Sequence, residues 1–114
     1  MPFINSKITM KLSPDKEEKI KQELGKAISV IPGKSENWLM VGFEDEYKLY
    51  FKGEKCETCA FVDVKVYGGA SSDAYNKMTA EITRIFGEEL GIPADKIYVA
   101  YQSTPDWGWN GGNF

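Results

Sequence analysis

The segment CAFVDVKVYGG, residues 59–69, decides the fold of this chain. β-Branched residues dominate its centre, so we predict a strand over Cys59–Tyr67 that ends at Gly68-Gly69. Another strand is expected over Lys96–Tyr101, and the residues between the two strands follow a helical pattern. The apolar positions of that pattern are Tyr75, Met78, Ile82, Ile85, Phe86 and Leu90. The segment therefore opens a strand-helix-strand unit.

The helix of this unit has signals at both ends. Ser71 or Ser72 suits the N-cap, where a side-chain oxygen accepts a hydrogen bond from an N–H of the first turn. Gly91 suits the C-terminal end, where a left-handed residue commonly stops a helix, and Pro93 follows soon after. We therefore predict that the helix lies between these signals.

The same order of elements occurs earlier in the chain. A first strand is predicted over Phe3–Thr9, and Ser13 and Pro14 then fit the N-cap and first position of a helix. Pro32-Gly33 ends that helix, whose apolar stripe is Ile20, Leu24, Ala27, Ile28 and Ile31. The run Trp38–Phe43 is almost continuously apolar, which is typical of a strand covered on both faces.

Two strand-helix-strand units predict an α+β fold. Right-handed connections place both helices on one face of a mixed four-stranded sheet, and the length favours one domain over residues 1–114. A short edge strand is expected around Tyr47, Leu49 and Phe51, before a turn at Lys52-Gly53. The other face of the sheet would lie bare, and its apolar content leads us to expect an oligomer.

Composition limits the chemistry that the chain can perform. The net charge is −3 and histidine is absent, so the chain has neither a basic footprint for nucleic acid nor an imidazole base. It also has no apolar run long enough for a bilayer and no signal-peptide pattern. We expect a cytoplasmic protein without metal, nucleic-acid or membrane partners, and any secretion would proceed without a signal peptide.

The N-terminus offers a base in place of histidine. An aminopeptidase that removes Met1 would leave Pro2 with a free secondary amine. An α-amino group titrates at about 7.7–8.0, and burial disfavours its charged form. A base with a pKa near the working pH suits proton transfer. With Met1 retained, the same nitrogen is an amide without useful basicity, and many chains begin Met-Pro without catalytic meaning.

Several short motifs follow one another in the sequence, and each is common by itself. They are Pro2-Phe3-Ile4, Gly33-Lys34, Cys56-Glu57-Thr58-Cys59, Gly68-Gly69, Gly91-Ile92-Pro93-Ala94-Asp95-Lys96-Ile97-Tyr98 and Gly108-Trp109-Asn110. In this order and spacing, within a chain of this length, they make the sequence resemble the macrophage migration inhibitory factor (MIF) family of the tautomerase superfamily. The resemblance covers nearly the whole chain.

The resemblance implies an assembly and a reaction. Relatives form homotrimers in which three sheets surround a solvent channel, with active sites at the subunit boundaries. The implied reaction is cofactor-free keto–enol tautomerisation of aromatic α-keto acids such as phenylpyruvate or hydroxyphenylpyruvate, and many relatives also isomerise L-dopachrome. Pro2 would act as the general base, taking a proton from one atom of the substrate and returning it to another.

The resemblance also implies substrate-binding residues. Lys34 matches a lysine that binds the substrate carboxylate, and Val64 stands where a backbone N–H contacts substrate. Tyr98 matches a tyrosine of the neighbouring subunit that can donate a hydrogen bond to the enolate oxygen. Aromatic side chains would line the pocket, namely Trp107, Trp109, Phe114 and, at its rim, Trp38. The alternatives are a solvated lysine at Lys34, strand packing for Tyr98 and simple anchoring of the C-terminal tail.

One residue departs from the family pattern, and two other functions stay open. Ala100 stands where the family often has asparagine, which makes dopachrome a weaker expectation than phenylpyruvate as a substrate.

A cytokine-like protein that binds a receptor is one alternative function, and it would depend on surface loops that one sequence cannot reveal. A thiol–disulfide oxidoreductase is the other, because Cys56 and Cys59 form a CxxC motif.

The CxxC motif lacks the features of an activated redox or metal site. It leads into a predicted strand, whereas thioredoxin-type thiols are activated at a helix N-terminus. Two protein ligands are too few for a tetrahedral zinc site. We therefore expect Cys56 and Cys59 to be reduced, structural cysteines, with the redox pair as the alternative.

Overall fold

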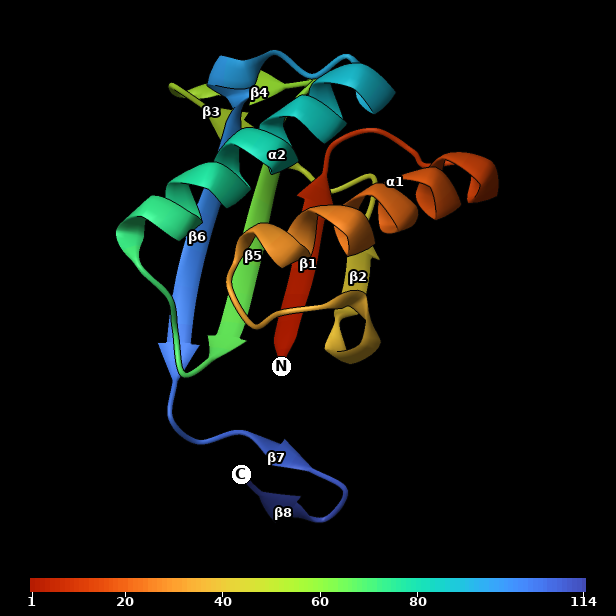
Figure 1. Cartoon of the computed structure of the whole chain (residues 1–114). Helices are drawn as coiled ribbons and strands as arrows, with labels where there is room; N and C mark the ends of the chain where they lie inside the picture. Colours follow the sequence, from red (N-terminus) through yellow and green to blue (C-terminus); the bar gives the residue numbers. More distant parts are fainter.

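In the computed structural model, which describes residues 1–114, two helices cover one face of a four-stranded sheet (Figure 1). The strand order is β2-β1-β5-β6. β1 pairs in parallel with β2 and antiparallel with β5, and β5 pairs in parallel with β6. These elements are β1 (Pro2–Ile8), β2 (Met40–Glu44), β5 (Ala60–Tyr67), β6 (Ile97–Thr104), α1 (Pro14–Ala27) and α2 (Ser72–Leu90). The predicted α+β fold is confirmed.

Capping residues set the ends of the helices, as the sequence predicts. The hydroxyl of Ser13 accepts a hydrogen bond from a backbone N–H in the first turn of α1. Ser71, rather than Ser72, does the same for α2. Gly91 ends α2 in the left-handed region at φ 67°, a conformation that glycine adopts without the steric cost of a Cβ atom.

Three predicted boundaries are wrong. The strand β6 continues to Thr104, three residues beyond its predicted end at Tyr101. The first helix ends at Ala27, and the chain continues as the 3-10 turn η1 (Ile28–Val30), because the last turn tightens before the proline that follows. The apolar run after it does not begin as a strand. Its first residue, Trp38, ends the 3-10 turn η2 (Glu36–Trp38), and β2 begins only at Met40.

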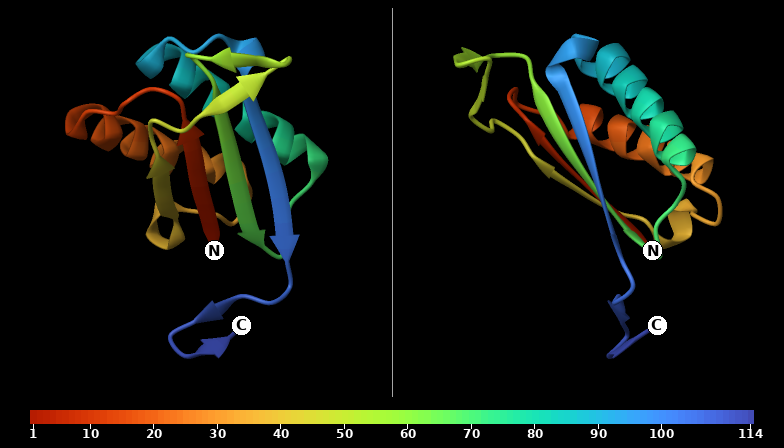
Figure 2. Two further views of the ribbon diagram at one scale, coloured as in Figure 1. Left: turned by 180° about the vertical axis from the view of Figure 1, so that it is seen from behind. Right: turned by 90° about the vertical axis from the view of Figure 1, so that its left-hand side faces the viewer.

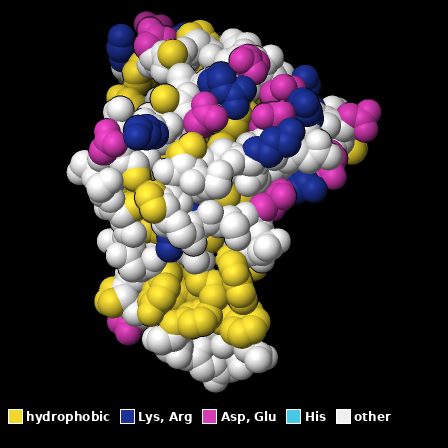
Figure 3. Space-filling model, in the orientation of Figure 1, with side chains coloured by type: hydrophobic (Ala, Val, Ile, Leu, Met, Phe, Trp, Pro, Cys, Tyr) yellow, Lys and Arg dark blue, Asp and Glu magenta, His cyan; other side chains and the backbone are white.

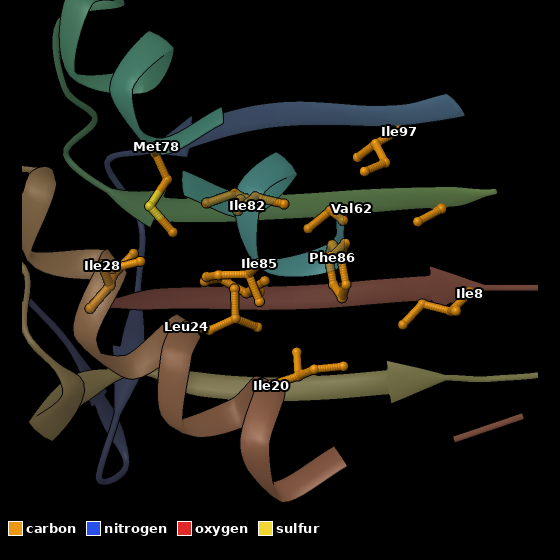
Figure 4. Close-up of a cluster of buried hydrophobic side chains, with 14 of the residues drawn as sticks. Ile8, Ile20, Leu24, Ile28, Val62, Met78, Ile82, Ile85, Phe86 and Ile97 are labelled. Atoms are coloured by element: carbon orange, nitrogen blue, oxygen red, sulfur yellow. The ribbon is translucent and has the colours of Figure 1, made fainter. Parts of the chain in front are cut away.

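The core lies between the helices and the sheet (Figure 4). Buried side chains alternate along β1 and β5, since successive residues of a strand point to opposite faces. The largest fully buried side chains are Ile4, Ile8, Ile20, Leu24, Ile28, Ile31, Val62, Val64, Met78, Ile82, Ile85 and Phe86. Ser6 is also fully buried, and its hydroxyl has no hydrogen-bond partner. The core therefore uses one face of the sheet only.

The opposite face of the sheet carries no helix (Figure 2). Polar pairs occupy its centre, where Lys7 contacts Asp63 at 2.9 Å and Asn5 donates to Glu44 at 2.8 Å. Tyr98 projects from β6 with 57% of its surface exposed. The predicted apolar character of this face is therefore wrong at its centre, because ion pairs and amide groups fill the middle of the sheet.

β2 lies at the edge of the sheet. It pairs with β1 alone, and Met40 at its start is 69% exposed. Val41 and Phe43 pack against the core from one side only. The predicted cover on both faces is therefore absent within the chain, because both helices lie on one face of the sheet.

Two hairpins extend from the main sheet. One joins β3 (Leu49–Phe51) to β4 (Glu54–Cys56), and its turn at Lys52 and Gly53 has positive φ at both residues. This hairpin confirms the predicted short strand, although Tyr47 lies outside it. The other joins β7 (Gly108–Trp109) to β8 (Gly112–Asn113) near the C-terminus and projects away from the body (Figures 1 and 2).

Candidate active site

The N-terminal end of β1 brings together Pro2 and Lys34. Pro2 is buried and lies opposite Val66 in β5. The next residue of β5, Tyr67, donates its N–H to the carbonyl of Met1 at 3.0 Å. Lys34, which follows the Pro32-Gly33 stop, donates from Nζ to the carbonyl oxygen of Tyr67 at 2.8 Å. The loop after the first helix therefore places a cation beside the start of the chain.

This environment disfavours a charged amine. The pKa of the amino group at Met1 lies below its ordinary value, first because of burial and then because of the charge and hydrogen bond of Lys34. The nitrogen of Pro2 lies one residue further along, and consecutive Cα atoms are only about 3.8 Å apart. An amine at Pro2 would therefore be subject to the same burial and the same cation.

Aromatic side chains gather next to this end of the sheet. The ring of Trp109 meets the ring of Trp38 edge-on at 5.3 Å. Phe114 lies 5.6 Å from Tyr67 and 6.1 Å from Trp109. Figure 3 shows hydrophobic side chains collected where the C-terminal hairpin joins the body. A hollow of about 240 Å³ lies in the hairpin, lined by Trp109, Asn110, Gly112, Asn113 and Phe114.

Trp107 belongs to the same segment but contributes differently. Its carbonyl accepts the backbone N–H of Phe114 at 3.1 Å, which closes the hairpin on itself. Its side chain is partly buried. Of the four aromatic residues predicted for the site, Trp38, Trp109 and Phe114 are therefore joined through ring contacts, and Trp107 supports the hairpin through its backbone.

Two other predicted site residues lie away from Pro2. Val64 is 1% exposed and lies opposite Ile4, so Val66 is the β5 residue opposite Pro2. Tyr98 pairs with Phe61 at the far end of β5. The distance from Phe61 to Val66 along the strand is about 16 Å at roughly 3.3 Å per residue. A single chain therefore does not bring Tyr98 to the N-terminus.

Tyr98 instead lines a separate apolar cleft of about 100 Å³. Its ring meets Phe51 of the β3–β4 hairpin at 5.5 Å and Phe61 of β5 at 6.4 Å. The cleft is lined by Leu49, Tyr50, Phe51, Cys59, Ala60, Phe61, Lys96 and Tyr98. Ala100, the departure from the family pattern, lies on β6 opposite Asp63 and is exposed.

Cys56 and Cys59 are joined in a disulfide, so the expectation of reduced cysteines is wrong. The Glu57–Thr58 turn brings their Cα atoms to 5.9 Å, within reach of such a bond. Thr9 supports the turn, because its hydroxyl donates to the carbonyl of Glu57 at 2.8 Å and accepts the N–H of Cys59 at 3.0 Å. The two cysteines are only 8% and 4% exposed, which favours a structural link over thiol exchange.

Tyr67 is the residue of this site that the sequence did not reveal. It contacts Met1 and Lys34 through its backbone and Phe114 through its ring. Backbone contacts do not depend on the residue type, so the sequence does not indicate them. The only signal in the sequence for Tyr67 is its position as an aromatic residue directly before Gly68-Gly69. The contribution of Tyr67 to the site is therefore visible only in the structure.

The structure also bears on other classes of site. No three or more Cys, Asp or Glu side chains come together in a group that could hold a metal ion. None of the helices combines the length and the apolar character that a bilayer crossing requires.

Known proteins share this architecture. MIF2 of Leishmania major is 33% identical, with 100% of this chain and 97% of that chain covered and a TM-score of 0.92. The macrophage migration inhibitory factor of Xenopus laevis is 24% identical over 96 residues, 81% of either chain.

More distant structures share the fold alone. Pt0534 inactivated by 2-oxo-3-pentynoate is 18% identical, with a TM-score of 0.85 over 96% of this chain and 93% of that one. A fused 4-OT described as a symmetric trimer is 16% identical, with a TM-score of 0.84 over 96% and 93%. The family profile described as macrophage migration inhibitory factor (MIF) matches residues 1–114. The chain therefore belongs to the MIF family, within the tautomerase superfamily.

Proposed function

We propose that this protein is a cofactor-free keto–enol tautomerase of aromatic 2-oxo acids, with phenylpyruvate and hydroxyphenylpyruvate as the substrate class. The base is the secondary amine of Pro2, which becomes free when Met1 is removed. The observation that carries the proposal is the position of Lys34, whose Nζ lies 2.8 Å from the carbonyl of Tyr67 and next to the N-terminal amine. L-Dopachrome is a weaker candidate, since Ala100 provides no side-chain donor.

The reaction follows from the chemistry of these groups. The Lys34 ammonium pairs with the substrate carboxylate, which fixes the 2-oxo group near the amine. The amine of Pro2 takes a proton from C3 of the keto form, and the electron pair moves onto the carbonyl oxygen as an enolate. The protonated amine of Pro2 then gives this proton to the enolate oxygen, which forms the enol and frees the amine, and the reverse path returns the proton to carbon. The amine ends unchanged, so the cycle needs no cofactor.

The aromatic residues match the aromatic part of such a substrate. Trp38, Trp109 and Phe114 lie near the same end of the sheet as Lys34, and flat rings bind one another in offset or edge-on arrangements. The inactivation of the structural relative Pt0534 by a 2-oxo compound agrees with this substrate class. A cation for the carboxylate and an aromatic wall for the ring together favour an aryl 2-oxo acid.

We also propose that the working form is a homotrimer. The fused 4-OT of similar fold is a symmetric trimer. Within one chain Pro2 and Tyr98 lie at opposite ends of the sheet, and the edge strand β2 has no partner beyond it. An assembly in which the Tyr98 end of one chain meets the Pro2 end of the next would supply the tyrosine hydroxyl that one chain lacks there.

The test is an enol–keto assay with phenylpyruvate on protein whose N-terminus has been verified by intact mass. Protein without Met1 should be active, and a Pro2→Gly variant, whose primary amine replaces the ring amine, should lose most of its turnover. A Lys77→Gln variant on the exposed face of α2 serves as the matched control. Unchanged turnover in Pro2→Gly, or full activity in protein that retains Met1, would place the base elsewhere.

A further inference from the structure

Gly25 is a helical residue of α1, where glycine is less favourable than alanine. Its φ is not positive, so the backbone conformation does not call for glycine. It is nevertheless buried, because the side chain of Glu36 lies over it. A Cβ atom at Gly25 would overlap the carboxylate of Glu36 and would lie 3.0 Å from its Cγ. The missing side chain of Gly25 therefore forms a seat for the Glu36 carboxylate on the helix.

The second helix offers a comparison, because α2 also contains a glycine. A Cβ atom at Gly87 would meet the carbonyl oxygen of Ile92 at 3.7 Å, which is an ordinary van der Waals contact. Alanine therefore fits at Gly87 without any movement of its neighbours. At Gly25 it fits only if Glu36 leaves the helix. The two glycines thus differ in what a methyl group would displace.

Glu36 belongs to residues 33–38, a segment that carries two residues of the candidate site. Lys34 donates from Nζ to the carbonyl of Tyr67 at 2.8 Å, and Trp38 contributes a ring to the aromatic group. The backbone N–H groups of Lys34 and Trp38 each bond a carbonyl three residues earlier. These local bonds shape the segment without joining it to α1, whereas the side chain of Glu36 reaches the helix.

A cation on the same face of α1 supports this contact. Lys21 precedes Gly25 by four residues, so the two lie next to each other on the helix surface. The pKa of Lys21 is raised first by the hydrogen bond of Glu18, and the charge of Glu36 adds to the rise. The seat thus combines contact with the helix backbone and attraction to a cation. Both act within one chain, so they persist whatever the other subunits of a trimer cover.

We propose that Glu36 is a positioning residue, whose carboxylate on Gly25 holds residues 33–38 against α1 and thereby keeps the Lys34 ammonium at the carbonyl of Tyr67. The catalytic consequence rests on the function proposed above, whereas the seat itself does not. A seated segment presents Lys34 to a substrate carboxylate beside the N-terminal amine. A segment released from the helix lets Lys34 move away from both.

The experiment compares Gly25→Ala, Glu36→Ala, Glu36→Gln and the double variant Gly25→Ala/Glu36→Ala in the full chain, with Gly87→Ala as the matched control. Amide hydrogen exchange over residues 33–39 reports the seat without reference to activity, because local backbone hydrogen bonds protect these N–H groups. Loss of a contact of the C–H···O kind should make exchange about two- to fivefold faster in Gly25→Ala and Glu36→Ala. Glu36→Gln keeps the shape of the side chain and should exchange at nearly the native rate.

Kinetics with phenylpyruvate report the position of Lys34. The KM should rise by about two- to fivefold in Gly25→Ala and Glu36→Ala, with kcat less affected, because the carboxylate contact is already made in the ground state. The pKa of the amine is lowered first by burial and then by Lys34, so a displaced Lys34 lowers it less. The acid limb of kcat/KM should therefore move to higher pH, which a purely structural role of Glu36 would not cause.

The outcomes separate the two proposals. Faster exchange in both single variants, no further increase in the double variant and native exchange in Gly87→Ala would support the seat. Unchanged exchange, additive effects, an equal change in Gly87→Ala or equal effects of Glu36→Gln and Glu36→Ala would overturn it. Faster exchange with native KM and acid limb would overturn the positioning role.

Two further results are also decisive. If Gly25→Ala does not fold, Glu36→Ala decides alone, since Glu36 lies at the surface. If native protein does not convert phenylpyruvate, the proposed function fails, while the exchange over residues 33–39 still decides whether Glu36 holds this segment against α1.

Discussion

Replacing Lys34 with glutamine would remove a cation from beside the N-terminal amine while keeping a polar side chain. In the structure Lys34 donates to the carbonyl of Tyr67 at 2.8 Å, and burial, followed by the charge and hydrogen bond of Lys34, lowers the pKa of the amino group at Met1. A hydrogen bond to a charged group contributes about 1.5–3 kcal/mol, and about 1.4 kcal/mol corresponds to tenfold in rate. We therefore expect kcat/KM for phenylpyruvate to fall by about 10- to 150-fold in Lys34→Gln.

The pH profile of the same variant gives a second and sharper expectation. A neighbouring cation disfavours the protonated amine, so its removal raises the pKa of that amine. With a higher pKa, less of the amine is free around neutrality, and activity is gained only as the pH rises further. The acid limb of kcat/KM should move to higher pH in Lys34→Gln and stay near its native position in Lys34→Arg, which keeps the charge.

The assay is the enol–keto conversion of phenylpyruvate, followed across the acidic and neutral range in verified Met1-free protein. Lys77→Gln, which removes an exposed lysine of α2, is the matched control. An acid limb that stays in place or moves to lower pH in Lys34→Gln would refute the reasoning. An equal movement in Lys77→Gln would do the same, because the effect would then come from net charge alone.

Three stability predictions concern other parts of the chain. Cys59→Ser removes the disulfide with Cys56, which closes a loop of four residues. From loop entropy we expect the free energy of unfolding, measured in urea, to fall by about 2 kcal/mol. A thiol reductant should cause the same loss in native protein and none in the variant. Ser6→Ala removes a buried hydroxyl that has no hydrogen-bond partner and should raise the free energy of unfolding by about 1 kcal/mol. A lower melting temperature of the variant would contradict this expectation. Lys52→Asn should stabilise the hairpin turn by up to about 1 kcal/mol. Lys52 has φ 55°, and asparagine adopts this left-handed backbone region at lower cost than lysine. An unchanged urea midpoint would show that the turn is not strained.

Local patterns predicted most of the fold. The alternation of apolar residues along β5 and the helical spacing along α2 depend on which face each element buries, and the sequence carries that information directly. Cap positions were equally readable, since Ser13 and Gly91 act on backbone groups within a few residues. The start of β2 was not readable, because the 3-10 turn that ends at Trp38 runs into the strand without a break in the apolar residues.

The candidate site was predictable only in part. Lys34 and the aromatic residues near the C-terminus could be named from the family resemblance, and in the structure Lys34, Trp38, Trp109 and Phe114 lie near one end of the sheet. Tyr67 could not be named, because two of its three contacts use backbone atoms.

Two other features depend on information that the sequence does not express. The redox state of a CxxC pair depends on geometry and surroundings, so the bond between Cys56 and Cys59 was missed. The separation of Tyr98 from Pro2 within one chain agrees with the resemblance, which assigned this tyrosine to the neighbouring subunit, but the strand register that sets it comes from long-range pairing.

Lys34 affects both partners of the proposed reaction, and its two effects support each other. Before substrate binds, burial and then the charge of Lys34 favour the unprotonated amine. When a substrate carboxylate pairs with Lys34, the positive charge beside the amine is neutralised, so the pKa of the amine rises in the complex. A rising pKa makes the amine a stronger acceptor at the moment when a proton leaves carbon. A neutral residue at position 34 would lose the substrate contact and this change in basicity together, whereas a lysine elsewhere on the surface could provide neither.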